Sequence, residues 1–384
     1  MRVAILAAYW PDWMDAMGDP SASGEHPYPW VRTLAHGLGD AGIEVHVFSI
    51  SRCLSRPVEK NVAGVHYHIG PFPSRPVRKL FPVRSTAMQL GHWVRSIAPD
   101  IVHAQGAGIY SHAALTCGAP SLVTIHGLAS QFPLMLQTAP RYQLRLELEV
   151  AAKARDVVAI SPFVREWLER HDYRGAVYSI ENPVDQVFFN NYEATGHSDS
   201  QNGSPRALFV GGLTRWKRLQ DCIEAIARVD GLYLDIVTHQ PPEGAYWETI
   251  AGMLANRPDV AQRVRFVGRL DSAALAARMS ESLCLLLPSE AETAPLVVSE
   301  SMACGLPVVA ANTGGVPYML NDGKTGFLVG VGDIDAIAQN LVVLRDSRSL
   351  RSAVRDAAHR DAETRFAVGL VVDKTLEAYA EVLA

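Results

Sequence analysis

Short apolar runs alternate with longer amphipathic stretches along most of this chain. The apolar runs are rich in β-branched residues and show no regular polar alternation, which is typical of strands buried on both faces of a parallel sheet. The stretches between them carry apolar residues at helical spacing. The pattern predicts strands at residues 2–8, 44–50, 101–103, 121–125, 157–160, 206–210, 233–237, 263–267, 283–287 and 307–310.

The alternation predicts an α/β fold in which helices cover both faces of each sheet. At 384 residues the chain is too long for one ordinary core. The polar segment between Asn190 and Arg206 is typical of a linker. We therefore predict two doubly wound, Rossmann-like domains, residues 1–188 and 206–363, facing one another across a deep cleft that binds ligands at the carboxyl ends of the strands. Residues 364–384 are expected to form a terminal helix that packs back on the first domain.

Composition excludes several classes of protein. No apolar run approaches the roughly 20 residues that a membrane span needs. The apolar start of the chain runs directly into Tyr9-Trp10-Pro11, without the cleavage site of a signal peptide. Five scattered cysteines with no Cys-x-x-Cys pair indicate reduced thiols and a cytoplasmic location, with no zinc site. The net charge of -5 gives no general basic footprint for nucleic acid.

One segment departs from this charge balance, since residues 60–99 contain no acidic residue. Its prolines favour a loop. Its basic and apolar side chains fit a phosphorylated or lipid-phosphate acceptor, or peripheral contact with the anionic inner face of a membrane. The alternative is a solvated basic face. The basic residues are Lys60, Arg75, Arg78, Lys79, Arg84 and Arg95, with Leu80, Phe81 and Trp93 among them.

Two glutamates follow the predicted strand 283–287. Glu292 lies in the loop at the carboxyl end of the strand, and Pro295 suits the first turn of a helix that holds Glu300. A loop carboxylate beside free helix N–H groups accepts hydrogen bonds from sugar hydroxyls, while the N–H groups hold anionic oxygens. A carboxylate within the helix accepts from a vicinal diol such as a ribose. The alternative is a helix-capping acid and a solvated glutamate.

A glycine turn follows the predicted strand 206–210. It reads Gly211-Gly212-Leu213-Thr214-Arg215-Trp216-Lys217 and combines a turn that opens into a helix N-terminus with a lysine ammonium. This combination is an anion site for a diphosphate that needs no metal. The alternative is an ordinary turn between a strand and a helix.

Two histidines, His103 and His126, each follow an apolar strand at the edge where such sheets bind ligands. Each is either a site residue or a buried histidine with satisfied hydrogen bonds. For His103 the buried interpretation is favoured.

The segment from Ser289 to Leu328 resembles the donor-binding segment of retaining glycosyltransferase family 4, which has the GT-B fold. The family pattern has two glutamates separated by seven residues. In this chain they correspond to Glu292 and Glu300, whereas Glu290 lies two residues too early for the pattern. Ser301-Met302-Ala303-Cys304-Gly305-Leu306-Pro307-Val308-Val309 and Gly314-Gly315 continue the match. Further elements match in the same order at residues 99–105, 122–127, 182–185 and 210–217, so the long unmatched stretches are 51–95 and 190–205.

The resemblance implies transfer of a sugar from a nucleotide-diphosphate donor to an acceptor hydroxyl, with no metal and no other cofactor. It implies catalytic roles for His126 near the transferred sugar, Glu292 at the sugar hydroxyls and Lys217 at the diphosphate, and a ribose contact for Glu300. The other implied donor-binding residues are Gly211, Gly212, Arg215, Arg269, Leu270, Ala294, Pro295 and Leu296, and those on the acceptor side are Gly24, Glu25 and His103.

The chain departs from the family pattern at several positions. Gly212 and Arg218 stand where the family has arginine and glycine, and Arg215 is the candidate substitute for the missing arginine. Gln105 stands where many members have another histidine. Glu25 replaces a glycine of the acceptor-side loop, so we expect unusual acceptor recognition.

The resemblance implies retention by same-face substitution, in which the leaving diphosphate takes the proton of the acceptor, and no residue suits the nucleophile of a double displacement. Asp333-Ile334-Asp335 has the spacing of a metal motif but is expected to cap a helix. The alternatives are an epimerase of nucleotide sugars on the same fold, a catalytically decayed binding protein and a sugar phosphorylase, and the paired glutamates argue against the epimerase. A UDP- or GDP-sugar donor and a glycan, lipid-linked or small-molecule acceptor are expected, but residue types do not identify either.

Overall fold

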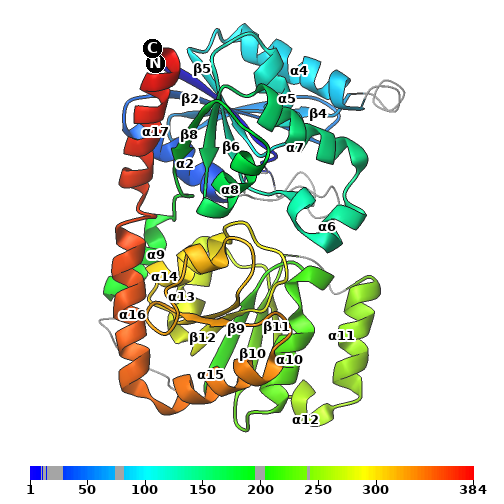
Figure 1. The fold of residues 1–384 in the computed structure, drawn as a ribbon, viewed down its shortest axis with the longest axis vertical. Helices are drawn as coiled ribbons and strands as arrows, with labels where there is room; N and C mark the ends of the chain where they lie inside the picture. Colours follow the sequence, from blue (N-terminus) through cyan, green and yellow to red (C-terminus); the bar gives the residue numbers. More distant parts are fainter. Residues whose placement is uncertain (10, 12–13, 15–28, 74–81, 195–203, 240–242) are drawn as a thin grey trace. The chain divides into compact units, whose positions relative to one another are not determined.

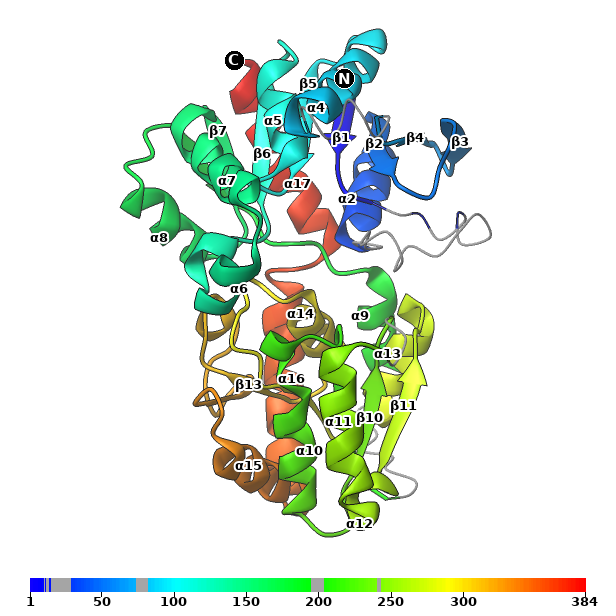
Figure 2. The same cartoon turned by 90° about the vertical axis from the view of Figure 1, so that its right-hand side faces the viewer.

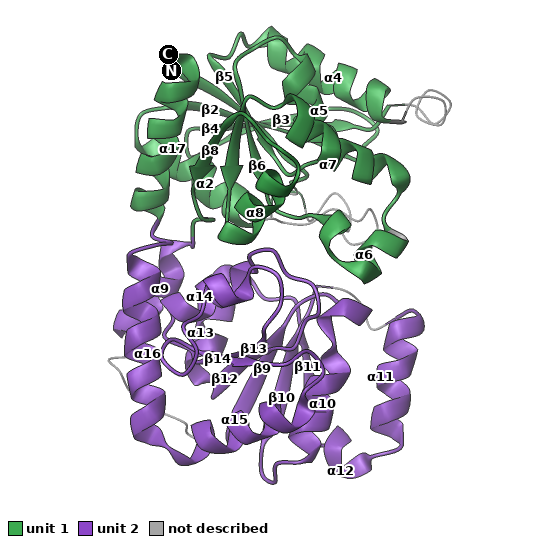
Figure 3. Ribbon diagram, viewed as in Figure 1, with its two compact units in different colours: residues 1–183, 368–384 green, residues 184–367 purple. Residues whose placement is uncertain are grey.

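The computed structural model describes the chain except residues 10, 12–13, 15–28, 74–81, 195–203 and 240–242. The chain divides into two compact units, which Figure 3 shows in different colours. Unit 1 comprises Met1–Pro183 and Val368–Ala384, and unit 2 comprises Val184–Ala367. Each unit is an α/β structure built on its own largely parallel sheet, which confirms the predicted fold class.

The sheet of unit 1 has the described strand order β3-β4-β2-β1-β5-β6-β7-β8. Neighbouring strands are parallel except β3 and β4, which are antiparallel. The strands are β1 (Arg2–Leu6), β2 (Glu44–Ser51), β3 (Val58–Val62), β4 (Val65–Pro71), β5 (Ile101–Gln105), β6 (Ser121–Ile125), β7 (Asp156–Ala159) and β8 (Ala176–Ser179). The helices are α2 (Pro29–Asp40), α4 (Pro82–Ser96), α5 (Ile109–Thr116), η2 (Ala129–Gln131), α6 (Pro133–Thr138), α7 (Arg141–Lys153), α8 (Pro162–Arg170) and α17 (Val368–Leu383).

Helices α2 and α17 lie side by side in unit 1 (Figure 1). Leu34 of α2 and Val371 and Tyr379 of α17 are buried in one apolar core with strands β1, β2 and β5. Gly37 allows this close packing, because a Cβ atom at this position would lie 2.7 Å from a methyl group of Val372. The last helix of the chain is therefore part of unit 1.

Helix α4 packs on unit 1 through Trp93, whose ring fills the space that a side chain at Gly70 would need. A Cβ atom at Gly70 would lie 1.6 Å from that ring. Leu90 and Val94 are buried on the same helix. The prediction of a loop is thus wrong for this part of the basic stretch, since Pro82 is the first helical residue, where proline is well tolerated. Arg75, Arg78, Lys79, Leu80 and Phe81 lie outside the described residues.

The sheet of unit 2 has the described strand order β11-β10-β9-β12-β13-β14, with every neighbouring pair parallel. The strands are β9 (Arg206–Val210), β10 (Tyr233–Val237), β11 (Val264–Gly268), β12 (Cys284–Leu287), β13 (Val308–Ala311) and β14 (Phe327–Val329). The helices are α9 (Gln186–Ala194), η3 (Arg215–Lys217), α10 (Leu219–Ala227), α11 (Ala245–Ala255), α12 (Pro258–Ala261), α13 (Ser272–Glu281), α14 (Leu296–Ala303), η4 (Val316–Tyr318), α15 (Ile334–Asp346) and α16 (Arg348–Glu363).

Both faces of the unit 2 sheet are covered by helices, as the turned view in Figure 2 also shows. Phe188 of α9, Met279 of α13 and Met302 of α14 share one apolar core with strands β9, β12 and β13. Ile223 of α10 and Leu341 of α15 belong to a second core on strands of the same sheet. The two cores cover both faces of the sheet, and loops follow the carboxyl ends of its strands.

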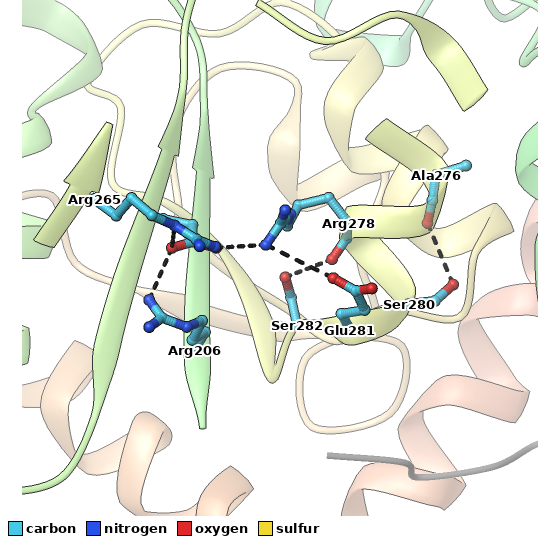
Figure 4. A network of polar contacts seen from close by, with 8 residues as sticks. Arg206, Arg265, Ala276, Arg278, Ser280, Glu281 and Ser282 are labelled. Carbon is cyan, nitrogen blue, oxygen red and sulfur yellow. Dashed lines mark hydrogen bonds and ion pairs between the residues drawn. The ribbon is translucent and has the colours of Figure 1, made fainter. Parts of the chain in front are cut away.

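A polar network lies beside the first of these cores (Figure 4). Asp235 of β10 is fully buried, and its carboxylate accepts hydrogen bonds from Arg206 at 3.0 Å, from Arg265 at 2.5 and 3.0 Å and from Arg278 at 3.1 Å. The three arginines come from β9, β11 and α13. A buried carboxylate needs such partners because an unpaired buried charge is costly. The network therefore ties three neighbouring strands to a covering helix.

The division between the units lies between Pro183 and Val184, before the predicted boundary at residue 188. Phe188 and Phe189 of α9 are buried in the core of unit 2, which explains the difference. The predicted linker after Asn190 therefore lies within unit 2. At the other end, unit 2 extends to Ala367 and not only to residue 363.

Each predicted strand is present, with ends displaced by no more than two residues. The pattern missed β3, β4, β8 and β14. Strand β3 is largely polar and exposed, and in β4 half-buried histidines alternate with buried apolar residues, so neither forms an apolar run. Strands β8 and β14 are short edge strands of 4 and 3 residues. Among the helices that the structure describes, none has both the length and the apolar character that crossing a membrane requires.

Candidate active site

The glycine turn at residues 211–217 lies where β9 ends beside β10. The N–H of Gly211 donates to the carbonyl of Val237 at 3.0 Å, so the turn starts from the sheet itself. The N–H of Thr214 then donates to the carbonyl of Gly212 at 2.9 Å, and η3 follows. The side chain of Lys217 lies against the start of the turn, since a Cβ atom at Gly211 would lie 3.7 Å from Lys217 Cδ. The lysine and the glycine turn therefore form one local structure.

Lys217 makes an ion pair with Glu292. The distance from Lys217 Nζ to Glu292 Oε1 is 2.5 Å, and only 20% and 9% of the two side chains are exposed. Strands β9 and β12 are neighbours in a parallel sheet, so the segments that follow them meet at the same edge. The structure thus brings together two of the residues predicted to be catalytic, although they are 75 positions apart.

Glu292 lies in the loop between β12 and α14, as the sequence predicts. Its carbonyl accepts a hydrogen bond from the N–H of Gly315 at 2.9 Å. Pro295 is the N-cap residue of α14 and makes no side-chain capping hydrogen bond, and Leu296 is the first helical residue. Ala294, just before the cap, packs partly buried against the core. The first N–H groups of α14 therefore lie close to Glu292 in the chain and receive no cap from Pro295, an arrangement that suits an anion.

Glu300 lies within α14 and is 7% exposed. Its carboxyl group forms no hydrogen bond or ion pair with the described residues. Burial raises the pKa of Glu300 to about 8, and the carboxylate of Asp185 adds to the rise. A buried polar group without a partner is unfavourable for folding. Such a group, with its perturbed pKa, is a candidate ligand contact.

Two buried hydroxyl groups also lack partners on these segments. The Oγ1 atom of Thr214, in the glycine turn, and the Oγ atom of Ser289, just after β12, have no hydrogen-bond partner among the described residues. Native proteins satisfy most buried polar atoms. The two unpaired hydroxyls lie at the same edge of the sheet as Lys217 and Glu292, and they are further candidates for ligand contacts.

The remaining predicted donor-site residues lie on neighbouring loops of unit 2. Arg215 is exposed on η3, and its side chain forms no hydrogen bond or ion pair within the described part of the chain. Its role in place of the arginine missing at Gly212 stays a prediction. Arg269 is exposed directly after β11, which ends at Gly268 with a φ of +85°, and Leu270 packs partly buried against the core.

In unit 1, His126 follows β6 and contacts Gln105 at the end of β5. The distance from His126 Nε2 to Gln105 Oε1 is 2.6 Å. With the amide oxygen of Gln105 facing the ring, this oxygen accepts and His126 carries its proton on Nε2. Burial lowers the pKa of His126 to about 3, with a further lowering from His103, so the imidazole is neutral near pH 7. The contact with Gln105 orients the histidine. The Nε2 atom of Gln105 has no partner among the described residues and so remains available as a hydrogen-bond donor.

The structure does not support an acceptor-side role for His103. Its side chain is 2% exposed, and its ring nitrogens lie 2.7 Å from the hydroxyl of Tyr379 and 2.6 Å from the hydroxyl of Thr124. Burial lowers the pKa of His103 to about 3. Both nitrogens are satisfied inside the core, so His103 helps to fix α17 on the sheet. Gly24 and Glu25, the other acceptor-side predictions, lie outside the described residues.

Asp333 behaves as a helix cap, in agreement with the sequence analysis. It is the N-cap residue of α15, and its side chain accepts a hydrogen bond from the N–H of Ala336 at 2.9 Å. Across the residues that the structure describes, no group of three or more histidine, cysteine, aspartate or glutamate side chains is arranged to hold a metal ion.

Sequence reasoning noted Arg218 only as a departure from the family pattern. In the structure it makes a two-point contact with Asp221 beside Lys217. The pairing of an arginine with an acid three residues later was the available signal.

Two protein-family models match the chain. "Glycosyltransferase Family 4" matches residues 30–187, and "Glycosyl transferases group 1" matches residues 204–347. Together they cover most of unit 1 and most of unit 2.

Known proteins are similar to the chain over most of its length. The D-inositol 3-phosphate glycosyltransferase of Paenarthrobacter aurescens is 28% identical over 97% of this chain and 96% of its own. Matches to two other curated relatives cover only 45% and 23% of those proteins. The sucrose-phosphate synthase of Thermosynechococcus elongatus has a TM-score of 0.83 at 21% identity, covering 99% of this chain and 98% of that one. HepE of Anabaena, solved in complex with UDP-glucose, has a TM-score of 0.73 at 17% identity, covering 99% and 100%.

Proposed function

The chain belongs to the family 4 glycosyltransferases with the GT-B fold, and from this premise we propose that it moves a sugar from a nucleotide-diphosphate donor to an acceptor hydroxyl, with retention at the anomeric carbon. The observation that carries the proposal is the contact between Lys217 and Glu292 beside the glycine turn. No comparison favours the epimerase, phosphorylase or decayed-protein alternatives.

The proposed donor site uses Lys217 and the start of α14 for the diphosphate. An ammonium group is a compact positive charge, and uncapped helix N–H groups add a fixed dipole of the same sign. Together they stabilise the charge that develops on the leaving diphosphate. Gly211 and Gly212 leave room for the phosphates at the turn, and the loop at Arg269 and Leu270 is proposed to read the base.

The two glutamates have different proposed roles. Glu292 is nearly buried beside Lys217 and accepts hydrogen bonds from hydroxyls of the transferred sugar. Before the ligand binds, the ion pair with Glu292 orients Lys217. When the diphosphate binds, the ammonium group of Lys217 contacts both the phosphate oxygens and Glu292. Glu300 has a buried carboxyl group with no partner among the described residues, and it is proposed to accept from the ribose hydroxyls. Ribose hydroxyls would supply the hydrogen-bond donors that the described residues do not give this carboxyl group.

His126 is proposed to contact the transferred sugar. Its neutral imidazole, held by Gln105, is a fixed dipole and not a cation. We propose same-face substitution, in which the C–O bond to the leaving diphosphate breaks while the acceptor oxygen forms the new bond on the same face. The acceptor proton passes to a leaving diphosphate oxygen, so the step needs no general base from the protein. Lys217 and the helix N–H groups are proposed to stabilise the leaving group in place of a divalent metal.

The donor is proposed to be a UDP- or GDP-sugar. The complex of HepE with UDP-glucose supports a uridine nucleotide, because that protein has the same fold. The acceptor is proposed to be a glycan, lipid-linked or small-molecule hydroxyl compound. A relative named for D-inositol 3-phosphate supports a phosphorylated small molecule.

Peripheral contact with an anionic membrane surface is also proposed, through one face of α4. Arg84, Met88, His92 and Arg95 recur at helical spacing and are exposed, and Met88 is 63% exposed. The helix carries no acidic residue. Basic residues near an anionic leaflet contribute about 1 kcal/mol each. Co-sedimentation of the wild type and of an Arg84→Glu, Arg95→Glu variant with anionic and neutral vesicles tests this contact, and binding to neither kind of vesicle contradicts it.

The proposed function is tested by assaying the release of nucleoside diphosphate from UDP- and GDP-sugars in the presence of hydroxyl acceptors, with and without EDTA. We expect release with one nucleotide, unchanged by EDTA, and a product whose NMR coupling constants show the anomeric configuration of the donor. An inverted product would contradict retention, and loss of activity with EDTA would contradict the metal-free site.

A further inference from the structure

Arg218 adopts an unusual backbone conformation at the junction of η3 and α10. Its φ of 52° and ψ of 44° lie in the left-handed region. A residue with a Cβ atom is strained there, whereas glycine is not. Glycine is also the residue that the family pattern has at this position. An arginine here needs contacts that offset the strain.

The side chain of Arg218 supplies those contacts. Its Nε atom donates to Asp221 Oδ2 at 2.7 Å, and a terminal nitrogen donates to Asp221 Oδ1 at 3.2 Å. The other terminal nitrogen lies 3.5 Å from Glu290 Oε2. Asp221 is 2% exposed, and burial raises its pKa while the bond to Arg218 opposes the rise. The guanidinium group therefore neutralises a buried carboxylate and reaches a second loop.

That second loop carries Glu292. The N–H of Glu290 donates to the carbonyl of Trp216 at 2.8 Å, and the Thr313 hydroxyl donates to the carbonyl of Glu290 at 3.0 Å. The η3 turn and the Glu290 loop are thus joined by one backbone bond and by the side chain of Arg218. Lys217 precedes Arg218 in the chain, and Glu292 follows Glu290 by two residues. The two joined segments are those that present the ion pair.

We propose that Arg218 is a positioning residue that holds the Lys217 turn against the Glu292 loop and so sets the contact between the Lys217 ammonium and the Glu292 carboxylate. The effect of this contact on donor binding rests on the proposed function, but the contact itself does not. Arg218 acts through Lys217 and Glu292 and need not touch the donor.

The first test measures the environment of Lys217 without any ligand. Acetic anhydride labels lysines at a rate that depends on exposure and ion pairing, and peptide mass spectrometry reads the rate at Lys217. Arg218→Gly removes the side chain and leaves a residue that accepts the left-handed backbone without strain. We expect labelling of Lys217 to rise at least fivefold in this variant. Arg228→Ala, which removes an exposed ion pair with Asp335 at the other end of α10, serves as the matched control and leaves the rate unchanged.

Arg218→Lys keeps the charge but cannot make the two-point contact with Asp221, so we expect an intermediate labelling rate. This variant also keeps the test valid if Arg218→Gly does not fold. An unchanged labelling rate in a folded variant would overturn the proposal. A general rise at all lysines would overturn it as well, because it would show loosening of the whole unit.

The second test is a double-mutant cycle on the affinity for UDP or GDP, measured by calorimetry. Arg218→Gly is expected to weaken binding about tenfold in the wild-type background and less than twofold in the Lys217→Ala background, because coupled residues are not additive. Equal losses in both backgrounds would overturn the positioning role. If the wild type binds no nucleotide, the proposed function fails, while the labelling result still decides the role of Arg218.

Discussion

The ammonium group of Lys217 lies 2.5 Å from the carboxylate of Glu292, and the two residues lie in the segments that follow the neighbouring strands β9 and β12 of the unit 2 sheet. The pair lies at the carboxyl edge of the sheet, beside the glycine turn and the start of α14. Ion pairs this well shielded require good geometry to be favourable. We interpret the pair as a preorganised part of the donor site, in which each group is held for a different part of the donor.

Removing either partner should abolish most of the activity. For Glu292→Gln and for Lys217→Ala we expect kcat to fall by about 100-fold or more, the usual loss for a group that stabilises transition-state charge. The fold should persist in both, since neither side chain belongs to an apolar core. Steady-state kinetics alongside circular dichroism checks the expectation. An unchanged rate in either variant would remove that residue from the donor site.

The buried carboxyl of Glu300 predicts a pH-dependent donor affinity. Its pKa of about 8 leaves it protonated at pH 7, whereas accepting from two ribose hydroxyls requires the ionised form. Affinity for the nucleotide should therefore rise as the pH increases from 6.5 towards 8 and level off above that, by at most about tenfold per pH unit. Calorimetry of wild type and Glu300→Gln over this range separates the effect from ionisation of the nucleotide phosphates. Parallel pH profiles in the two proteins would exclude the ribose role.

The same group has the opposite effect on folding without a ligand. Its folded pKa of about 8 lies above the ordinary value of 4.5, so the folded state binds the proton more tightly. Its contribution to stability is complete below pH 4.5 and is lost as the pH rises through 8. The thermal unfolding temperature of the wild type should therefore fall relative to that of Glu300→Gln as the pH rises over that interval. An identical pH dependence of the two unfolding temperatures would contradict the raised pKa.

Replacing His126 should affect turnover more than nucleotide binding. In His126→Ala we expect kcat to fall by about 100-fold and the affinity for UDP or GDP to change less than twofold, because the histidine is assigned to the sugar and not to the nucleotide. Comparison of kcat with the calorimetric dissociation constant tests this assignment. Equal losses in both quantities would place His126 in the nucleotide pocket.

Asp235 should matter for stability and not for chemistry. Asp235→Asn removes the charge shared by Arg206, Arg265 and Arg278, and we expect a loss of about 3 kcal/mol in unfolding free energy, the lower end for breaking a buried pair because the arginines remain partly exposed. Arg228→Ala, which breaks an exposed pair, should cost less than about 1 kcal/mol. Urea unfolding compares the two variants. Equally small losses would mean that the network does not stabilise the sheet.

Much of the fold was predictable because buried parallel strands form continuous apolar runs. Strands such as Ser121–Ile125 and Arg206–Val210 were placed at their exact bounds for that reason. The edge strands were not, since β3 has exposed polar residues and β14 is too short for a periodic signal. The boundary after Pro183 was missed because Phe188 and Phe189 commit α9 to unit 2 through tertiary packing, which local polarity does not reveal.

The site divides in the same way. The positions of Lys217 and Glu292 follow from strand ends and motif spacing, but their direct contact depends on β9 and β12 being neighbours, which a sequence does not state. His103 and His126 occupy similar places after their strands, yet His103 is satisfied by Tyr379 from a helix 276 residues away. The left-handed backbone of Arg218 is equally invisible in the residue type.

The central claim is a metal-free donor site built around Lys217. Calorimetric titration of the wild type and of Lys217→Ala with UDP, GDP and ADP, each with and without EDTA, tests it most directly. We predict binding of one nucleoside diphosphate by the wild type, unchanged by EDTA, and at least about tenfold weaker binding by Lys217→Ala, which corresponds to about 1.4 kcal/mol. No binding of any nucleotide, or equal binding by both proteins, would contradict the account.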